Sequence, residues 1–301
     1  MNIPPMDNFS VTVAIPCFNG EKYLSDNIVS ILKQSRKPDE ILVVDDGSTD
    51  CSAEIAGNFQ EVKLIRHLSN LGLAESRNTA LKNASGNIIV YLDADIIAHP
   101  KLLESLLSQY SSDDIAGVGG RGIESKWGMG GFSRKNEANN IYNQWRSLHA
   151  SQGFGEKFID GVSMLWGLCS SYRIEVLRII GGFDKIYKTN GEDVDIGIKI
   201  NNLGLKLVYT PDAIVYHRRD DDFDSLREML FRWYFWGYKA KRKNRNPAFA
   251  NYMKIILFAS IKNIIYDLIN KKNPSLALLS LKASGIELKA TFRALWENLK
   301  E

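Results

Sequence analysis

Two aspartates, Asp93 and Asp95, follow directly after the apolar run Ile88–Leu92. Because one residue separates them, an extended chain end directs both side chains to the same side. Two carboxylates placed in this way can hold Mg²⁺ or Mn²⁺ and leave coordination positions for water and for the oxygens of a diphosphate. Acidic residues at a strand end also serve as turn and helix-cap residues. The pair alone therefore predicts either a divalent-cation site or a turn.

A second acidic segment, residues 45–50, follows the apolar run 41–44. A carboxylate of this segment could accept the imide N–H of a uracil, whereas Ser48 or Thr49 could cap the helix that follows. The two roles are compatible with each other. Considered together with the first acidic pair, this segment favours a nucleotide site over a simple turn.

Arg77 lies in the segment 70–78, which opens a predicted helix between the two acidic strand ends. A guanidinium in the first turns of that helix could bind a base or a phosphate. Considered by itself, a solvent-facing helical arginine is the simpler interpretation.

The acidic segment 191–195 precedes an amphipathic run, so it predicts the first turn of a helix, where the helix dipole favours acidic side chains. When a hydroxyl group attacks a donor molecule, a carboxylate must also accept the hydroxyl proton. Such general-base catalysis is worth roughly 10²- to 10⁴-fold in rate. Asp193 is the candidate for that role.

Short β-branched runs alternate with helix-length segments from residue 11 to about residue 118. The predicted strands cover 11–16, 41–44, 62–66, 88–92 and 115–118, and the predicted helices cover 21–34, 73–83 and 100–110. This alternation predicts an α/β fold with a parallel, doubly wound sheet. Such sheets bind ligands beyond the carboxyl ends of their strands, so both acidic strand ends should line one crevice. The first strand lacks a following GxGxxG turn, which disfavours a dinucleotide-dependent oxidoreductase.

The pattern beyond residue 118 is less regular. Residues 117–131 are rich in glycine and predict a loop, in which Trp127 could close over a ligand or simply lie at the surface. Further predicted elements are a helix over 136–149, a run ending at 214–217, and helical segments over 226–238, 250–270 and 275–299.

The composition is that of an ordinary globular protein, with 301 residues, 45% hydrophobic and 24% charged. Three cysteines without a CxxC pair predict neither a disulfide framework nor a zinc site, which favours a reducing cytosol. No signal peptide and no transmembrane stretch are expected.

The net charge is +3, but residues 226–301 carry +10 and residues 1–225 therefore carry −7. This asymmetry predicts a catalytic domain over 1–225 and a basic, aromatic-rich helical region over 226–301.

The motifs as a set resemble the family 2 glycosyltransferases, and the resemblance covers about residues 11–217. The matching motifs are 13–19, 43–50, 70–78, 91–95, and 181–184 followed by Glu192 and Asp193. The resemblance implies a GT-A fold, which is a Rossmann-like, mostly parallel sheet flanked by helices. It also implies a nucleoside-diphosphate-sugar donor, UDP-sugar above all, a divalent cation (Mg²⁺ or Mn²⁺), and inversion at the anomeric carbon.

The resemblance also implies roles for individual residues. On the donor side, Asp46 is similar to the uracil-binding acid, Pro16 and Asn19 would border the base pocket, and Arg77 would line it. Asp95 looks like the metal-binding acid, and Asp93 like its partner toward ribose or metal. Asp193 looks like the catalytic base, with Glu192 positioning the acceptor or the base. His217 is similar to a histidine that completes the metal coordination in some GT-A enzymes, although a histidine at a strand end is usually structural.

Three other classes compete with a transferase that adds one sugar to each acceptor. Processive synthases that resemble this family carry a QxxRW signature and membrane spans, whereas Met229–Trp233 lacks the glutamine. A nucleotide-sugar-binding protein without transferase activity would not need the candidate base. A nucleic-acid-binding protein would not explain the acidic strand ends.

The segment 231–245 joins six aromatic residues to six basic residues. In a core helix, the aromatic side chains would pack on the rest of the chain and the basic side chains would be solvated. In a membrane-interface anchor, the aromatic rings would lie at headgroup depth and the basic residues would contact anionic lipid. The second arrangement would suit a peripheral protein on the cytoplasmic face of the membrane with a lipid-linked acceptor; a soluble glycan acceptor would suit the first.

Overall fold

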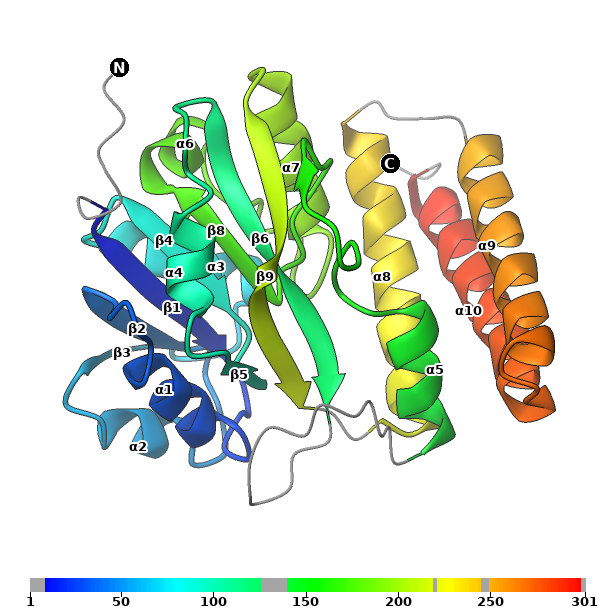
Figure 1. Ribbon diagram of the computed structural model, residues 1–301, viewed down its shortest axis with the longest axis horizontal. Coiled ribbons are helices and arrows are strands. Elements are labelled where there is room, and N and C mark those ends of the chain that lie inside the picture. Colours follow the sequence, from blue (N-terminus) through cyan, green and yellow to red (C-terminus); the bar gives the residue numbers. More distant parts are fainter. Residues whose placement is uncertain (1–8, 126–139, 219–220, 245–248, 299–301) are drawn as a thin grey trace. The chain divides into compact units, whose positions relative to one another are not determined.

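The computed structural model describes residues 9–125, 140–218, 221–244 and 249–298. Their packing divides the chain into two compact units, drawn in Figure 1. The first unit, which we call the sheet unit, comprises the described residues of 1–123 and 152–218. The second, the helical unit, comprises those of 124–151 and 219–301.

One mixed sheet of nine strands, counted over the described residues, forms the centre of the sheet unit. The strands are β1 (Val11–Cys17), β2 (Glu40–Asp45), β3 (Val62–Arg66), β4 (Ile88–Leu92), β5 (Ile96–Ala98), β6 (Ile115–Ser125), β7 (Ile159–Asp160), β8 (Cys169–Arg173) and β9 (Lys206–Arg218). Their order is β3-β2-β1-β4-β8-β6-β9-β5, with β7 paired to β9. Strands β1 to β4 pair in parallel, whereas the pairings of β8 with β4 and β6, and of β9 with β5 and β7, are antiparallel.

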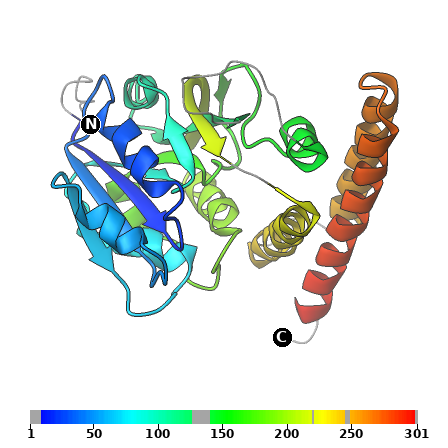
Figure 2. The ribbon, with the colours of Figure 1, turned by 90° about the horizontal axis from the view of Figure 1, so that it is seen from below.

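Helices α1 (Leu24–Leu32), α2 (Ser52–Gly57), α3 (Leu73–Asn83), α4 (Leu102–Leu107), α6 (Ile174–Ile179) and α7 (Glu192–Asn202) flank this sheet (Figure 2). Strands β1 and β4 are buried along their whole length, which explains their nearly continuous apolar sequences. In α1, Leu24, Ile28 and Ile31 are buried because their spacing places them on one helix face. The sheet and these helices share one apolar core.

The strand order brings the two acidic strand ends to the same edge of the sheet. β1 lies between β2 and β4, all three run in the same direction, and Cys17 at the end of β1 pairs with Asp45. Asp46 and Asp93 follow the ends of β2 and β4. The predicted α/β fold with a mostly parallel sheet flanked by helices and a C-terminal helical extension is confirmed.

The prediction of a loop over 117–131 is wrong for its first part, because β6 continues to Ser125. The glycines allow close packing inside the sheet instead of a turn. A Cβ atom added at Gly120 would come within 2.4 Å of the Ala213 carbonyl oxygen, and one at Gly119 within 2.9 Å of the Leu165 side chain. The remainder of the predicted loop, with Trp127, lies outside the described residues.

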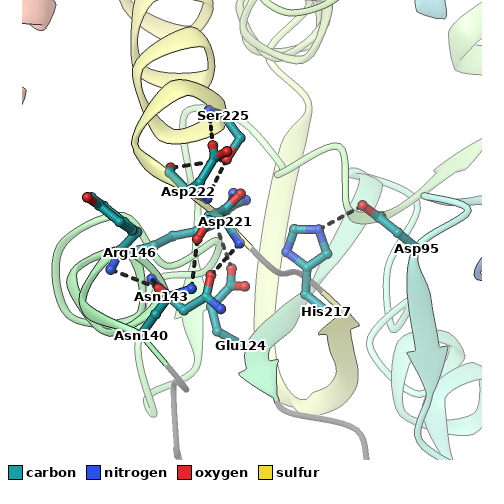
Figure 3. Close-up of polar contacts among 10 residues, drawn as sticks. Asp95, Glu124, Asn140, Asn143, Arg146, His217, Asp221, Asp222 and Ser225 are labelled. Atoms are coloured by element: carbon teal, nitrogen blue, oxygen red, sulfur yellow. Dashed lines mark hydrogen bonds and ion pairs between the residues drawn. The ribbon is translucent and has the colours of Figure 1, made fainter.

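The helical unit contains α5 (Ile141–His149), α8 (Phe223–Lys243), α9 (Phe249–Ile269) and α10 (Pro274–Asn298). Asn140 caps α5 by accepting the N–H groups of Tyr142 and Asn143, and Asp222 and Ser225 form a reciprocal capping box at the start of α8 (Figure 3). Residues 140–151 and 221–225 thus pack with the C-terminal helices. The predicted functional division at residue 225 stays a prediction.

Buried ionic groups connect the helices of this unit. The Arg146 guanidinium lies 3.2 Å from a carboxylate oxygen of Glu124 and 3.1 Å from one of Asp221 (Figure 3). Asp267 of α9 contacts the His149 imidazole of α5 at 2.7 Å and accepts a hydrogen bond from the Ser280 hydroxyl of α10 at 2.6 Å. These contacts fix which faces of α9 and α10 are turned inward.

Two of the aromatic side chains of α8 are buried inside the helical unit, whereas those of Phe231, Trp233, Tyr234 and Trp236 are half-buried. Phe235 and Tyr238 are buried against Tyr252 of α9 and Ala290 of α10. Of the neighbouring basic residues, Lys239 pairs with Glu297 at 3.3 Å. The core-helix interpretation of segment 231–245 therefore holds for Phe235 and Tyr238, which have no surface to offer to lipid. No helix of the described residues is both long and apolar enough to cross a membrane.

Candidate functional site

Asp46 organises the turn that precedes α3. One of its carboxylate oxygens accepts the Leu71 N–H at 2.9 Å and the other accepts the Gly72 N–H at 2.8 Å. Gly72 has a φ of 98°, and a Cβ atom there would come within 2.8 Å of Lys188. Only glycine suits both the backbone conformation and the space.

The carboxylate of Asp46 is also tied to the body of α3 through His67. The His67 Nδ1 atom lies 2.6 Å from Asp46, and its Nε2 atom lies 2.9 Å from the Thr79 hydroxyl. Asp46 is only 3% exposed and both of its oxygens have protein partners. Its predicted contact with uracil stays a prediction, and the structure adds a second role, which is to hold this turn.

The other residues predicted to border the base pocket lie at the end of β1. Pro16 is buried and pairs with Val44 of β2. Asn19 is exposed, has a φ of 52°, and accepts the Thr49 N–H at 3.0 Å through its side-chain oxygen. Asn19 thus ties the end of β1 to the acidic segment after β2, while its exposure leaves it accessible to a ligand.

Arg77 is buried rather than solvent-facing, with 1% of its surface exposed. Its Nη1 atom donates to Glu192 Oε1 at 2.7 Å, and its Nη2 atom donates to the Gly167 carbonyl at 3.1 Å. The same Nη2 atom lies 3.7 Å from Asp93 Oδ1. Arg77 therefore brings together Asp93 at the end of β4 and Glu192 at the start of α7. The simpler interpretation of Arg77 as a surface residue is wrong, and its contacts point toward these acids rather than toward Asp46.

Aromatic rings and an amide hold Arg77 in this position. Its guanidinium lies over the rings of Tyr91 and Phe183, at 5.7 and 5.5 Å from their centroids. Asn78, the next residue of α3, exchanges two hydrogen bonds with the backbone of Phe183, at 2.7 and 2.9 Å. The segment 181–184 is thus attached to α3.

Glu192 and Asp193 form the first turn of α7, which follows Gly191 in a left-handed conformation with a φ of 92°. Burial raises the pKa of the Asp193 carboxyl, while Arg77 and then the N–H groups of Val194 and Gly167 oppose that shift. Burial also raises the pKa of Glu192, against the effect of Arg77 and with a further contribution from Asp193. A carboxyl whose pKa lies above its ordinary value is a stronger base for a hydroxyl proton.

Gly167 lies next to both Arg77 and Asp193. Its carbonyl accepts the hydrogen bond from Arg77, and its N–H is one of the groups that lower the pKa of the Asp193 carboxyl. A Cβ atom at residue 167 would lie 2.6 Å from the Arg77 Nη2 atom. A glycine is required at this position because the Arg77 guanidinium approaches the backbone too closely for a side chain.

Asp95, which directly precedes β5, and His217, which lies on β9, form a second pair at the far end of the sheet order. Ile96 of β5 pairs with His217 of β9, which places the His217 Nε2 atom 3.3 Å from Asp95 Oδ2 (Figure 3). His217 is buried and the Asp95 side chain is 26% exposed. The structure thus joins two of the predicted metal ligands.

The donor set of Asp95 and His217 fits a divalent cation. Among the described residues, no group of three or more His, Cys, Asp and Glu side chains is arranged as a metal site. Mg²⁺ and Mn²⁺ are commonly held by one or two protein ligands together with water and substrate phosphates, so a partly exposed carboxylate beside an imidazole suffices. Asp93 also presents a partly exposed carboxylate at this edge.

Sequence reasoning did not assign roles to Asn78, His67, Thr79 and Gly167. Asn78 lies within the segment 70–78, directly after Arg77, and this position in the sequence could have indicated a role for it. His67, Thr79 and Gly167 carry no local signal, because their partners lie in other elements.

Residues 12–180 match the family described as glycosyl transferase family 2. Among curated proteins, a glycosyltransferase (GlyA) of Streptococcus pneumoniae is 30% identical over 227 residues, which are 69% of this chain and 30% of that protein. The chain thus spans less than a third of the length of that relative. A glucosyl-dolichyl phosphate glucuronosyltransferase of Haloferax volcanii is 24% identical over 289 residues, covering 89% of this chain and 88% of that protein.

Among solved structures, the fold matches a mannosyltransferase of Pyrobaculum calidifontis in complex with GDP-Man and Mn²⁺. The TM-score is 0.61 at 21% sequence identity, and the match covers 95% of this chain and 80% of that one. The similarity confirms the expected GT-A architecture.

Proposed function

The chain belongs to glycosyl transferase family 2, and on that premise we propose that it moves one sugar from a nucleoside-diphosphate sugar to an acceptor hydroxyl with inversion at the anomeric carbon. The observation that carries the proposal is that Arg77 contacts both Asp93 and Glu192, with Asp193 beside them. A donor-side acid and a candidate base are thereby held in one rigid arrangement.

In the proposed reaction, Asp193 accepts the proton of the attacking hydroxyl while the sugar–phosphate bond breaks on the opposite face of the sugar. Glu192 and Arg77 orient Asp193 and fix its distance from Asp93. The raised pKa of Asp193 suits this proton transfer at neutral pH. Asn19, Pro16 and Asp46 would shape the base pocket at the ends of β1 and β2.

Asp95 and His217 would hold Mg²⁺ or Mn²⁺, with Asp93 toward the ribose or the metal. The bound cation would supply positive charge that neutralises the diphosphate as it leaves. Arg77 lies too deep to replace that charge, because its guanidinium is fully enclosed by protein.

UDP-sugar is the proposed donor, on the strength of the Asp46 motif, and a glycan or a lipid-linked molecule is the proposed acceptor. The relative from Haloferax volcanii is named for a dolichyl phosphate acceptor, which favours the lipid-linked class. A lipid-linked acceptor would place the protein peripherally at the cytoplasmic face of a membrane.

A panel of UDP- and GDP-sugars with Mn²⁺ or Mg²⁺ tests the proposal without knowledge of the acceptor. Slow release of nucleoside diphosphate from one donor, lost with EDTA, is the expected result. Tight nucleotide binding without release from any donor would instead favour a nucleotide-sugar-binding protein.

A further inference from the structure

Helix α9 exposes a continuous stripe of large apolar side chains opposite its buried face. The residues Phe258, Ile261, Ile265 and Ile269 follow one another at spacings of three and four, so they share one face of the helix. All four are exposed, and Phe258 is 74% exposed. A helix that is apolar on both faces is normally covered on both.

Helix α10 exposes a matching stripe. Leu278, Leu281, Phe292 and Trp296 are exposed and lie on one face by the same helical spacing, with Trp296 62% exposed. The opposite face carries Leu276, Leu279 and Ala283, which pack against α8. The buried face of α9 likewise packs against α8 through Tyr252. Both exposed stripes therefore point away from α8. Together we call them the α9–α10 apolar face.

The exposed charges on α9, α10 and the turn between them all have one sign. The exposed basic residues are Lys254, Lys262, Lys271, Lys272, Lys282, Lys289 and Arg293. The acidic residues Asp267 and Glu287 are buried, and Glu297 pairs with Lys239 and Arg293. Apolar and aromatic side chains interleaved with basic ones, and without exposed acids, are complementary to an anionic bilayer surface.

We propose that the α9–α10 apolar face docks on an anionic membrane surface, with the apolar side chains at the headgroup and acyl boundary and the lysines on the lipid phosphates. The proposal deepens the lipid-linked acceptor suggested above and rests on that part of the proposed function. It assigns membrane contact to α9 and α10, in place of the aromatic run of α8, whose Phe235 and Tyr238 are buried.

Vesicle sedimentation of the full chain tests the proposal, using vesicles of phosphatidylcholine alone or of phosphatidylcholine and phosphatidylglycerol in equal parts. We expect binding to the anionic vesicles only, and weaker binding as salt is added. The variant Lys254→Gln/Lys262→Gln should lose affinity about 5-fold for each lysine, about 25-fold in total. Phe258→Glu/Ile265→Glu should abolish binding.

Matched controls use exposed residues of the sheet unit. Lys82→Gln/Lys101→Gln removes two exposed lysines, and Ile179→Glu places a charge at another exposed apolar site. Neither control should change vesicle binding, and circular dichroism should show that every variant keeps the parental helix content.

Release of nucleoside diphosphate from the donor, measured without acceptor or lipid, separates this proposal from the proposed function. Parental release in Phe258→Glu/Ile265→Glu together with lost vesicle binding supports the docking surface. Vesicle binding that neither α9 variant alters would overturn it. The proposal would also be overturned if the parent does not bind vesicles but forms a dimer that Phe258→Glu/Ile265→Glu dissociates. That result would assign the α9–α10 apolar face to contact with a second copy of the chain.

Discussion

Arg77→Met should destabilise the sheet unit because it leaves Glu192 buried without its counter-ion. Glu192 is 2% exposed, and Arg77 supplies both its ion pair at 2.7 Å and the charge that opposes the rise in its pKa. Removing one partner of a buried ion pair typically costs about 3–5 kcal/mol. For a unit of this size, that loss lowers the thermal midpoint by roughly 6–20 °C.

The destabilisation should depend on pH. In the variant, the pKa of Glu192 in the folded protein lies still further above its ordinary value of 4.5. The folded state then binds a proton that the unfolded state releases, so the free energy of unfolding falls as pH rises above that value. We therefore expect the difference between parent and Arg77→Met to be larger at pH 9 than at pH 5.

Thermal and urea unfolding at both pH values measure this effect. Lys206→Met is the matched control, since it removes an ion pair with Asp114 whose side chains are both exposed, and no resolvable change is expected from it. Arg77→Met/Glu192→Leu, which removes both charges, should recover much of the lost stability. A loss in Arg77→Met no greater than in Lys206→Met, or one equal at both pH values, would refute the assigned ion pair.

Three further predictions concern the site. Asp95→Ala should weaken UDP binding in Mn²⁺ to the level that the parent shows in EDTA, as measured by calorimetry; equal affinity in all three conditions would remove Asp95 from the metal site. The acidic limb of the profile of kcat/KM against pH should lie above 3.8, the ordinary aspartate value, because burial raises the pKa of Asp193 and the base must be deprotonated to act; a limb at or below that value would exclude Asp193. Gly167→Ala should lower kcat and displace that limb while Gly57→Ala should not, because a Cβ atom meets the Arg77 guanidinium at residue 167 and nothing within 4 Å at residue 57.

Sequence periodicity identified the elements whose pattern is local. The predicted bounds of β3, β4 and α3 coincide with those in the structure, because each has an apolar repeat closed by turn residues. The positions of the acidic strand ends at one edge also followed from the strand-helix alternation. The antiparallel β8 was missed, since its sequence Cys169–Arg173 is polar although it is buried between β4 and β6.

Features that depend on distant partners were not predictable in the same way. Arg77 is separated from Glu192 by 115 positions in the chain, and no local pattern distinguishes a buried helical arginine from an exposed one. The glycines of β6 indicate a loop in a single sequence, but they serve close contacts with Ala213 and Leu165. The aromatic residues of α8 could face lipid or core, and only their packing decides between these environments.

The most direct test of the proposed reaction is the rate of nucleoside diphosphate release by Asp193→Asn, using the donor that the parent hydrolyses. We predict that calorimetric UDP affinity in Mn²⁺ stays at the parental value while the release rate falls by roughly two to four orders of magnitude, as expected for loss of a general base. Parental turnover in Asp193→Asn would contradict the account and direct attention to Glu192 as the base.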